Sequence, residues 1–531
     1  MLRRLPPALI AAALFLAFAF VLYGASVRAG FVADDWGFLV LSDTAPSAAI
    51  IFAPLVDRYL RPLVVLLYYV NYKAFGLWPV PYHATAIALH ALNGWLLCVL
   101  VTKLSGRRAT GLFTGLLFLA FAGHSEAVVW IGGIADVVLA PFVLGALVLL
   151  AYGIERERPL RWLAPVSILL PLGLLAKETA VVAPLLASAL CVYFAARSDS
   201  PAGVLRRSAA ALAIPFLAVG AYMLLRARIF GNPVSAYSDL SLSAGMFFPE
   251  LRAFVLRVFL PAYWRLALAW AHGYDLVLLA GGAAVFAAAL IRDRDRRADM
   301  IFAAAAIAIT LAPALPLTIS LATTETERVI YTPSAFGALL TVLILESLVG
   351  RRALQRLLLG ALVVAHGLFL QRFTRAWIEA GDAFASNTRT FVEAVRAHDP
   401  GPARLIFITN LPDNIRGAYV FRRCFYEGLH FIAPDLEQRQ DAIYGISSHG
   451  LGRYSEPTIL QQFGPMEIGV DVGPNRFVQS GPPARPPYQF LSWSPERFRL
   501  RFTALAEGGI VLGSSRGRVT YMCDVKETRG S

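Results

Sequence analysis

The first long apolar run of the chain, Ala8-Leu-Ile-Ala-Ala-Ala-Leu-Phe-Leu-Ala-Phe-Ala-Phe-Val-Leu22, is closely followed by Phe31-Val-Ala-Asp-Asp-Trp-Gly-Phe38. The first stretch is typical of a membrane-spanning helix, and the second places two carboxylates just after that helix ends. Ionised carboxylates at the edge of a bilayer are costly, so they are candidates for a function. The alternative is that Asp34 and Asp35 only mark a helix end that faces water.

The composition indicates a polytopic α-helical membrane protein. Of the 531 residues, 57% are hydrophobic and only 16% are charged, and the mean hydropathy is +0.60, which is more apolar surface than a soluble core can use. The net charge of +13 does not indicate nucleic acid, because basic residues are expected in the cytosolic loops of membrane proteins. The four cysteines have no metal-ligand spacing and predict neither a zinc site nor a disulfide framework: Cys98, Cys191, Cys424 and Cys523.

Further apolar segments are long enough, or nearly so, to cross a membrane core of about 30 Å. They lie at residues 83–103, 110–122, 134–152, 161–175, 178–196, 208–225, 275–291, 300–320, 333–349 and 355–371. Together with the first run they predict about eleven transmembrane helices. No good small-x-small cleavage site precedes Asp34, so we expect the first run to be a retained signal anchor.

Basic residues fall in alternate loops, and under the positive-inside rule these loops and the N-terminus are cytosolic. An odd number of spans then places the Asp34–Asp35 loop and everything after about Gln371 on the outer face. The basic clusters are Arg3 and Arg4; Lys103, Arg107 and Arg108; Arg156, Arg158 and Arg161; Arg206 and Arg207; Arg292 to Arg297; and Arg351 and Arg352.

The segment from Phe247 to Trp270 is apolar enough to cross a membrane but carries arginines, including Arg257 and Arg265. A span here would move the cluster at Arg292 to the outer face. We therefore assign residues 227–274 to one outer loop with an amphipathic helix that lies in the membrane interface. The alternative is a true span whose arginines face a cavity.

After Gln371 the pattern changes to that of a small mixed α/β domain. We therefore divide the chain into a transmembrane domain at residues 1–371 and an extracytoplasmic domain at residues 372–531. The second domain has an amphipathic helix at Arg372–His398, a buried strand at Arg404–Thr409, a turn at Leu411–Asn414 and strand patterns at 497–503, 509–512 and 518–521. On the outer face Cys424 and Cys523 could pair, although the sequence does not place them near each other.

Carboxylates, cations and one histidine recur in the loops predicted to face outward. They are Asp34, Asp35, Asp57, Arg58, Arg61 and Lys73; His124, Glu126 and Asp136; Lys177 and Glu178; Arg226, Arg228, Arg252, Arg257 and Arg265; and Glu325, Glu327, Arg328 and Tyr331. Some have an ordinary alternative. Lys177 and Glu178 could form a surface pair, and Arg328 a local ion pair with the glutamates beside it. His83 and His90 are better explained as packing and hydrogen-bonding residues than as metal ligands.

This combination of groups suits the transfer of a sugar from a polyprenyl phosphate. Such a donor presents a buried lipid tail, an anionic leaving group at the membrane surface and an electrophilic anomeric carbon. Transfer needs a carboxylate that takes the proton of the acceptor hydroxyl and cations that bind the departing phosphate. Arginine suits the second task because its planar guanidinium stays charged and binds phosphate oxygens in pairs.

The order of these motifs resembles that of the GT-C membrane glycosyltransferases. The likeness is greatest to the protein O-mannosyltransferase group and its relatives with transmembrane and tetratricopeptide-repeat parts, and more distant to the lipid A arabinose transferases. It covers about the first 335 residues. The motifs that carry it are Asp34-Asp35, Arg61-Pro-Leu, Phe75-Gly76, Tyr82-His83, His90-Ala-Leu-Asn93, His124-Ser-Glu-Ala-Val-Val-Trp130, Asp136, Lys177-Glu178 and Arg328 to Ser334.

The resemblance implies an inverting glycosyltransferase and a role for each matching residue. Asp34 is expected to be the general base and Asp35 to support or orient it. The remaining residues divide into a set that binds the donor phosphate, which comprises Arg61, Lys177 and Arg328, and a set on the sugar or acceptor side, which comprises His124, Glu126, Asp136 and Tyr331. The resemblance implies no cofactor and no obligatory metal.

The C-terminal domain departs from the family, because it shows neither a 34-residue helical repeat nor a carbohydrate-binding trefoil. The acceptor hydroxyl could therefore belong to a protein, a glycan or a lipid. Residues 411–423 are a weak acceptor-site candidate, with an ordinary surface turn as the alternative. Two other functions stay open, a transporter or flippase for a lipid-linked saccharide and a noncatalytic envelope assembly factor. We expect a bacterial inner membrane protein whose C-terminal domain is periplasmic.

Overall fold

The computed structural model describes residues 7–52, 54–55, 59–154, 160–232, 244–261, 274–321, 323–398, 404–451, 457–473, 477–479, 487–494, 496–503 and 508–525. The chain divides into two compact units. The first, called the helical unit, comprises Met1–Val27 and Pro46–Thr374, and the second, called the C-terminal unit, comprises Arg28–Ala45 and Arg375–Ser531. The break after Thr374 lies near the predicted boundary at residue 371, whereas the short Arg28–Ala45 segment groups with the second unit.

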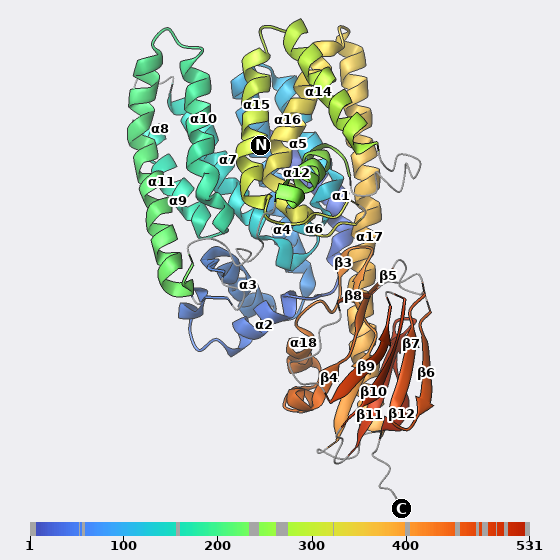
Figure 1. Ribbon diagram of the computed structural model, residues 1–531. Helices are drawn as coiled ribbons and strands as arrows, with labels where there is room; N and C mark the ends of the chain where they lie inside the picture. Colours follow the sequence, from blue (N-terminus) through green and yellow to red (C-terminus); the bar gives the residue numbers. More distant parts are fainter. Residues whose placement is uncertain are drawn as a thin grey trace, which may run out of the picture. The chain divides into compact units, whose positions relative to one another are not determined.

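The helical unit consists mainly of apolar α-helices of very different lengths (Figure 1). They are α1 Pro7–Tyr23, α3 Pro62–Phe75, α4 Pro79–Ser105, α5 Arg108–Ala120, α6 Ser125–Val128, α7 Ala135–Gly153, α8 Leu160–Leu163, α9 Val166–Leu174, α10 Ala183–Ala195, α11 Pro201–Phe230, α12 Ala244–Phe259, α14 Asp275–Arg292, α15 Arg297–Leu311, α16 Tyr331–Leu348 and the first part of α17 Arg352–His398. Short 3₁₀ turns join several of them, including η3 Ala122–His124, η5 Glu178–Val182 and η8 Glu327–Ile330.

Among the described residues, nine helices are long and apolar enough to cross a membrane, or ten if α5 and the bent segment after it form one span. The predicted class, a polytopic helical membrane protein, is therefore confirmed, although the expected number was about eleven. The difference includes residues 161–175, where the structure has the short helices α8 and α9 in place of one span. Pro165 precedes α9 and Pro171 lies inside it, and proline removes a helical hydrogen bond and disfavours a continuous helix.

Helix α12 forms where the sequence predicted a helix in the loop at residues 227–274, and its place in the membrane interface stays a prediction. It packs against α16 and η8, and the side chain of Arg257 is only 2% exposed because it forms an ion pair with Glu327 of η8. Arg265, like Asp57 and Arg58, lies outside the described residues.

Helix α17 continues without a break through residue 371, where the sequence predicted a span that ends and a second helix that begins. It runs from Arg352 to His398, so its first part belongs to the helical unit and its last part to the C-terminal unit. No proline occurs in this stretch to end the helix.

In the part of the C-terminal unit that the structure describes, helices combine with three four-stranded sheets, which confirms the predicted mixed α/β domain. The strand orders are β12-β11-β1-β4, β6-β7-β10-β9 and β3-β2-β5-β8. Its elements are α2 Asp35–Thr44, β1 Leu405–Thr409, β2 Leu411–Ile415, β3 Ala418–Tyr419, α18 Phe425–Ile432, α19 Pro434–Glu437, β4 Ile443–Gly445, β5 Ser448–Leu451, β6 Ile459–Gly464, β7 Glu467–Asp471, β8 Phe477–Gln479, β9 Tyr488–Trp493, β10 Arg497–Phe502, β11 Gly509–Ser515 and β12 Arg518–Val525.

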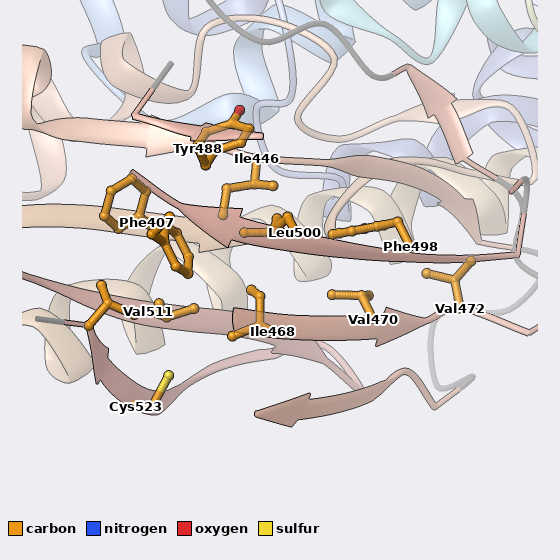
Figure 2. Packing of buried hydrophobic residues seen from close by; sticks show 12 residues of the cluster. Phe407, Ile446, Ile468, Val470, Val472, Tyr488, Phe498, Leu500, Val511 and Cys523 are labelled. Carbon is orange, nitrogen blue, oxygen red and sulfur yellow. The ribbon is translucent and has the colours of Figure 1, made fainter. Parts of the chain in front are cut away.

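The core of this unit lies where β1 and β11 face the sheet of β7 and β10, and Figure 2 shows its apolar side chains in contact. Strand β10 alternates as predicted, because Phe498, Leu500 and Phe502 are buried while the arginines between them are exposed. The buried strand predicted at 404–409 is confirmed as β1, and the patterns at 509–512 and 518–521 are confirmed as parts of β11 and β12.

Two expectations for the C-terminal unit are wrong. Residues 411–414 are not a turn but part of β2, which is buried along its length because it pairs with β3 and β5. The stretch 411–423 is therefore no surface turn, and the side chain of Asp413 in it is 1% exposed. The sequence left open whether Cys424 and Cys523 form a disulfide. In the structure they do not, since all four cysteines are free thiols.

Candidate active site

Lys177 and Glu178 are neighbours in sequence but bind different partners. Lys177 Nζ lies 2.5 Å from Asp136 Oδ2, and Glu178 accepts two hydrogen bonds from Arg61, from Nη2 at 2.7 Å and from Nε at 3.1 Å. The alternative of an isolated Lys177–Glu178 surface pair is therefore wrong. The two adjacent residues instead connect the start of α10 to α7 and to the segment before α3.

Local backbone structure explains this divergence. Lys177 is extended, with φ −158° and ψ 142°, and successive side chains of an extended backbone point in opposite directions. Asp136 lies in the first turn of α7, where the helix dipole favours a negative charge. Arg61 precedes Pro62, which opens α3, and its guanidinium lies 4.0 Å from the ring centre of Tyr59.

A second set of ion pairs forms where η8 meets α6 and α12. Glu126 of α6 is fully buried, and its carboxylate forms an ion pair with the Arg328 guanidinium and accepts a 2.9 Å hydrogen bond from the Arg328 backbone N–H. The Arg328 guanidinium also lies 5.2 Å from the ring centre of Trp130. Arg328 thus pairs with Glu126, which is 202 residues away in sequence, while Glu327 pairs with Arg257.

These pairs balance four cations with four carboxylates: Arg61 with Glu178, Lys177 with Asp136, Arg328 with Glu126, and Arg257 with Glu327. Burial lowers the pKa of Arg61, but the Glu178 carboxylate raises it, and the net shift is upward. The guanidinium therefore remains charged. A phosphate group can bind such a cation by replacing the carboxylate that holds it, because both anions use the same paired oxygens.

His124 and Tyr331 lie inside the helix bundle, in a network of polar side chains. The Tyr331 hydroxyl accepts a 2.9 Å hydrogen bond from Asn93 Nδ2 and lies 2.7 Å from His90 Nδ1, while His124 Nε2 lies 2.7 Å from Ser334 Oγ. All of these side chains are buried. The hydrogen-bonding role predicted for His90 is confirmed, and Tyr331 is the residue that connects α4 to α16.

An apolar groove begins at the Lys177–Asp136 pair. Among the described residues that line it, Asp136 is the one ionisable side chain. The lining residues are Asp136, Leu139, Val143, Thr179, Ala180, Val182, Ala183, Leu186, Thr310, Ala314, Val329, Thr332 and Pro333. The three threonines could not be predicted from the sequence, because nothing in it distinguishes a threonine that lines a groove from one inside an apolar helix.

Asp34 and Asp35 belong to the C-terminal unit and differ in their surroundings. Asp35 opens α2 with only 1% of its surface exposed, and its Oδ2 accepts a 2.9 Å hydrogen bond from the backbone N–H of Val32. Asp34 precedes it as the N-cap residue and is partly exposed. The hydrogen bond from Val32 thus holds the Asp35 carboxylate in place.

Comparison with known proteins relates part of this chain to enzymes. No family model matches it. Over 188 residues it is 36% identical to Protein O-mannosyl-transferase Tmtc1 of Drosophila melanogaster, which covers 32% of this chain and 21% of the relative. It is 32% identical over 142 residues to Protein O-mannosyl-transferase TMTC1 of Mus musculus, which covers 24% of this chain and 15% of the relative. The chain thus matches about a fifth or less of the length of these relatives.

Among solved structures, the chain is similar to a crystal structure of ArnT from Cupriavidus metallidurans bound to undecaprenyl phosphate. The alignment has a TM-score of 0.45 and 14% sequence identity, and it covers 92% of this chain and 97% of that chain.

Proposed function

We propose that this chain, which is related through the matched segment to the protein O-mannosyltransferases of the GT-C membrane glycosyltransferases, is itself an inverting glycosyltransferase. Its donor is a sugar linked to a polyprenyl phosphate, and its acceptor is a hydroxyl group. We place the reaction at the outer face of a bacterial inner membrane, with the N-terminus cytosolic and the C-terminal unit periplasmic, on the distribution of basic loop residues.

The observation that carries the proposal is the apolar groove that starts at a buried ion pair. Asp136 lines the groove and binds Lys177, and Glu178 beside Lys177 binds Arg61. A ligand with an apolar chain and an anionic head matches such a surface, because the chain buries apolar area while the head binds cations. A polyprenyl phosphate has both parts.

In this proposal Arg61, Lys177 and Arg328 bind the phosphate of the donor. Arg328 is the most exposed of these cations, with 25% of its side chain accessible against 16% for Arg61 and 6% for Lys177. We therefore assign the first encounter with the phosphate to Arg328. Glu126 and Asp136 hold these cations in position between turnovers. His124 supports α16 through Ser334, and Tyr331 supports it through His90 and Asn93 of α4.

Asp34 is the general base. Its carboxylate takes the proton of the acceptor hydroxyl as the hydroxyl oxygen attacks the anomeric carbon of the sugar. The bond between that carbon and the phosphate oxygen breaks, and the polyprenyl phosphate departs with the electron pair while the cations stabilise its charge. Attack on the face opposite the leaving group inverts the anomeric configuration. Asp35 is the orienting residue, since its carboxylate is held by the Val32 amide.

The test is sugar transfer in membranes that carry wild type or Asp34→Asn at matched expression, with a panel of radiolabelled polyprenyl-phosphate sugars. The substitution removes the proton acceptor and nearly preserves shape. We expect turnover to fall about a hundredfold or more, which is the usual effect of losing a general base. The sugar that the wild type transfers identifies the donor.

Two results would count against the proposal. Unchanged turnover of Asp34→Asn would move the general base to another carboxylate. No turnover by the wild type on any lipid-linked donor would favour a transporter or an assembly factor, and transport of the labelled lipid across proteoliposomes would then separate those two functions.

A further inference from the structure

The segment that carries Asp34 and Asp35, residues 28–45, is packed within the C-terminal unit, although more than 300 residues separate it in sequence from the rest of that unit. The backbone N–H of Ala33 donates a 3.1 Å hydrogen bond to the carbonyl oxygen of Val420. Gly30 lies directly against Gly381 of α17, where a Cβ on Gly381 would come within 2.5 Å of the Gly30 nitrogen. The backbone just before the carboxylates is thus held by distant residues.

Helix α2, which begins at Asp35, is held by side chains of the same unit. The indole ring of Trp36 stacks on Phe384 of α17, with ring centres 5.1 Å apart and planes inclined by 19°, and lies 6.0 Å from the Phe431 ring of α18. At the other end of α2, Asp43 Oδ2 lies 3.0 Å from Nε2 of His430. The helix is therefore fixed at its first and last turns.

The residue before Asp34 adopts a backbone conformation that favours glycine. Ala33 has φ 45°, in the left-handed region where a Cβ comes too close to the backbone, so residues other than glycine rarely adopt it. Such a conformation persists where surrounding contacts over-determine it, and it occurs most often at functional sites. The hydrogen bond from Ala33 to Val420 is such a contact, and it sets the direction in which the chain enters Asp34.

We propose that the C-terminal unit is a positioning device for the Asp34 carboxylate, and that Gly381 and Val420 are positioning residues that act through the backbone of residues 30–33. The inference rests on the proposed function, in which Asp34 is the general base. It gives the C-terminal unit a role in the reaction itself, apart from any role in binding the acceptor.

The contact can be tested without any assay of turnover. A Cβ placed on Gly37 would lie 3.1 Å from the Cys424 Sγ, which is about the separation of a Cβ from the far sulfur of a disulfide. In the full-length protein, Gly37→Cys should therefore form a disulfide with Cys424 on treatment with diamide. The nearby carboxylates and, above all, burial raise the pKa of the Cys424 thiol, so an added oxidant is needed. Gly37→Cys combined with Cys424→Ser is the control that should form no bond.

The cross-link also tests whether the contact belongs to the working enzyme. We expect oxidised Gly37→Cys to retain the turnover of its reduced form within about twofold, because the bond only fixes a contact that already exists. Absence of the cross-link would overturn the contact. Formation of the cross-link with a loss of turnover that dithiothreitol reverses would overturn the positioning role, since the segment would then have to leave this position to work.

The positioning role is tested by two matched substitutions in α17. Gly381→Ala places its Cβ against the Gly30 backbone, whereas a Cβ at Gly360, in the same helix, meets nothing within 4 Å. We expect Gly381→Ala to lower kcat at least about tenfold with little change in the KM for the donor, because a displacement of less than 1 Å at a catalytic group can cost that much. Gly360→Ala should leave both constants unchanged.

Equal kcat values for Gly381→Ala and the wild type would overturn the inference. A higher KM for the donor with an unchanged kcat in Gly381→Ala would also overturn the inference, because it would show an effect on binding and not on the chemical step. If the wild type transfers no sugar, the proposed function fails and the positioning role fails with it, while the cross-link yield still decides whether residues 28–45 contact α18.

Discussion

Lys177 Nζ and Asp136 Oδ2 lie 2.5 Å apart, and no more than 6% of either side chain is exposed. This pair joins the loop before α10 to the first turn of α7 at the head of the apolar groove. A buried ion pair contributes little net stability compared with apolar residues of the same shape, but the loss of one partner leaves the other charge buried and unpaired. That asymmetry makes the pair suitable for a double-mutant cycle.

Lys177→Met should destabilise the protein by about 3–5 kcal/mol, because the Asp136 carboxylate loses its partner in the interior. Adding Asp136→Asn should recover most of that loss. The measurement is the thermal unfolding midpoint in detergent for the wild type, both single variants and the double variant. If Lys177 binds the donor phosphate, the double variant should be stable and yet transfer sugar at a strongly reduced rate. A stable and fully active double variant would remove Lys177 from the phosphate site.

Arg61→Lys should lower kcat/KM for the donor about tenfold, which corresponds to about 1.4 kcal/mol. Lysine keeps the charge, but it loses both the paired hydrogen bonds to Glu178 and the stacking of the guanidinium on Tyr59. The measurement is initial rate against donor concentration.

Glu178→Gln provides the complementary test of Arg61. If a phosphate replaces this carboxylate on Arg61, weakening the carboxylate should strengthen product inhibition by free polyprenyl phosphate. Weaker inhibition in this variant would show that Glu178 supports phosphate binding and does not compete with it.

The sequence predicted much of the fold but not the partners of the charged residues. Hydrophobic run length and the alternation in β10 follow from local periodicity, so the helices and several strands could be found from one chain. The partners of Arg328 and Lys177 could not, because Glu126 and Asp136 lie 202 and 41 residues away and only tertiary packing decides which charges meet. The same limit applies to β2, whose Pro-Asp-Asn sequence is typical of a turn but whose pairing with β3 and β5 makes it a strand.

Residues 28–45 show the same limit most clearly. The charges of Asp34 and Asp35 drew attention to the segment, but its sequence gives no sign that Ala33 binds the carbonyl of Val420 or that Gly30 lies against Gly381. Those contacts join the first 50 residues to the last 160, and no local pattern encodes them.

Tyr331→Phe should destabilise the helical unit by about 1–3 kcal/mol, since the lost hydroxyl leaves Asn93 and His90 with a buried hydrogen-bonding group to satisfy. The substitution removes one oxygen atom and preserves packing, so a stability change reports on the hydrogen bonds. Thermal unfolding in detergent is the measurement, with Tyr274→Phe as a control, because Tyr274 is half exposed. A Tyr331→Phe variant that loses turnover while keeping its stability would place the hydroxyl at the substrate instead.

Ala33→Gly should leave the fold intact and raise the unfolding free energy by up to about 1 kcal/mol, because glycine adopts a positive φ without the steric cost that alanine carries. The entropy that glycine loses on folding offsets part of this gain. Ala33→Val should have the opposite sign, since a β-branched side chain is least tolerated there. Equal unfolding midpoints for Ala33→Gly and Ala33→Val would show that the backbone conformation at this position does not affect the stability of the fold.

The pair of His430 with Asp43 should make the stability of the C-terminal unit depend on pH. His430 Nε2 faces Asp43 and its Nδ1 faces Glu437, both at 3.0 Å, and the hydrogen bond to Asp43 is the largest cause that raises the pKa of His430 above its ordinary value. A group whose pKa is higher in the folded state stabilises the fold fully below its unfolded pKa of about 6.5. That contribution is lost as the pH rises through the folded pKa.

The wild type should therefore be more stable than His430→Gln at pH 6, by about 1 kcal/mol or less because the pair is partly exposed, and the difference should vanish at about pH 9. Pulse proteolysis of the full-length protein across this range measures it, and high salt should reduce it because screening weakens exposed pairs. Asp43→Asn should remove most of the pH dependence, whereas Glu437→Gln should remove less of it. A difference between wild type and His430→Gln that grew with pH would mean that the neutral imidazole is the form that holds α2 against α18.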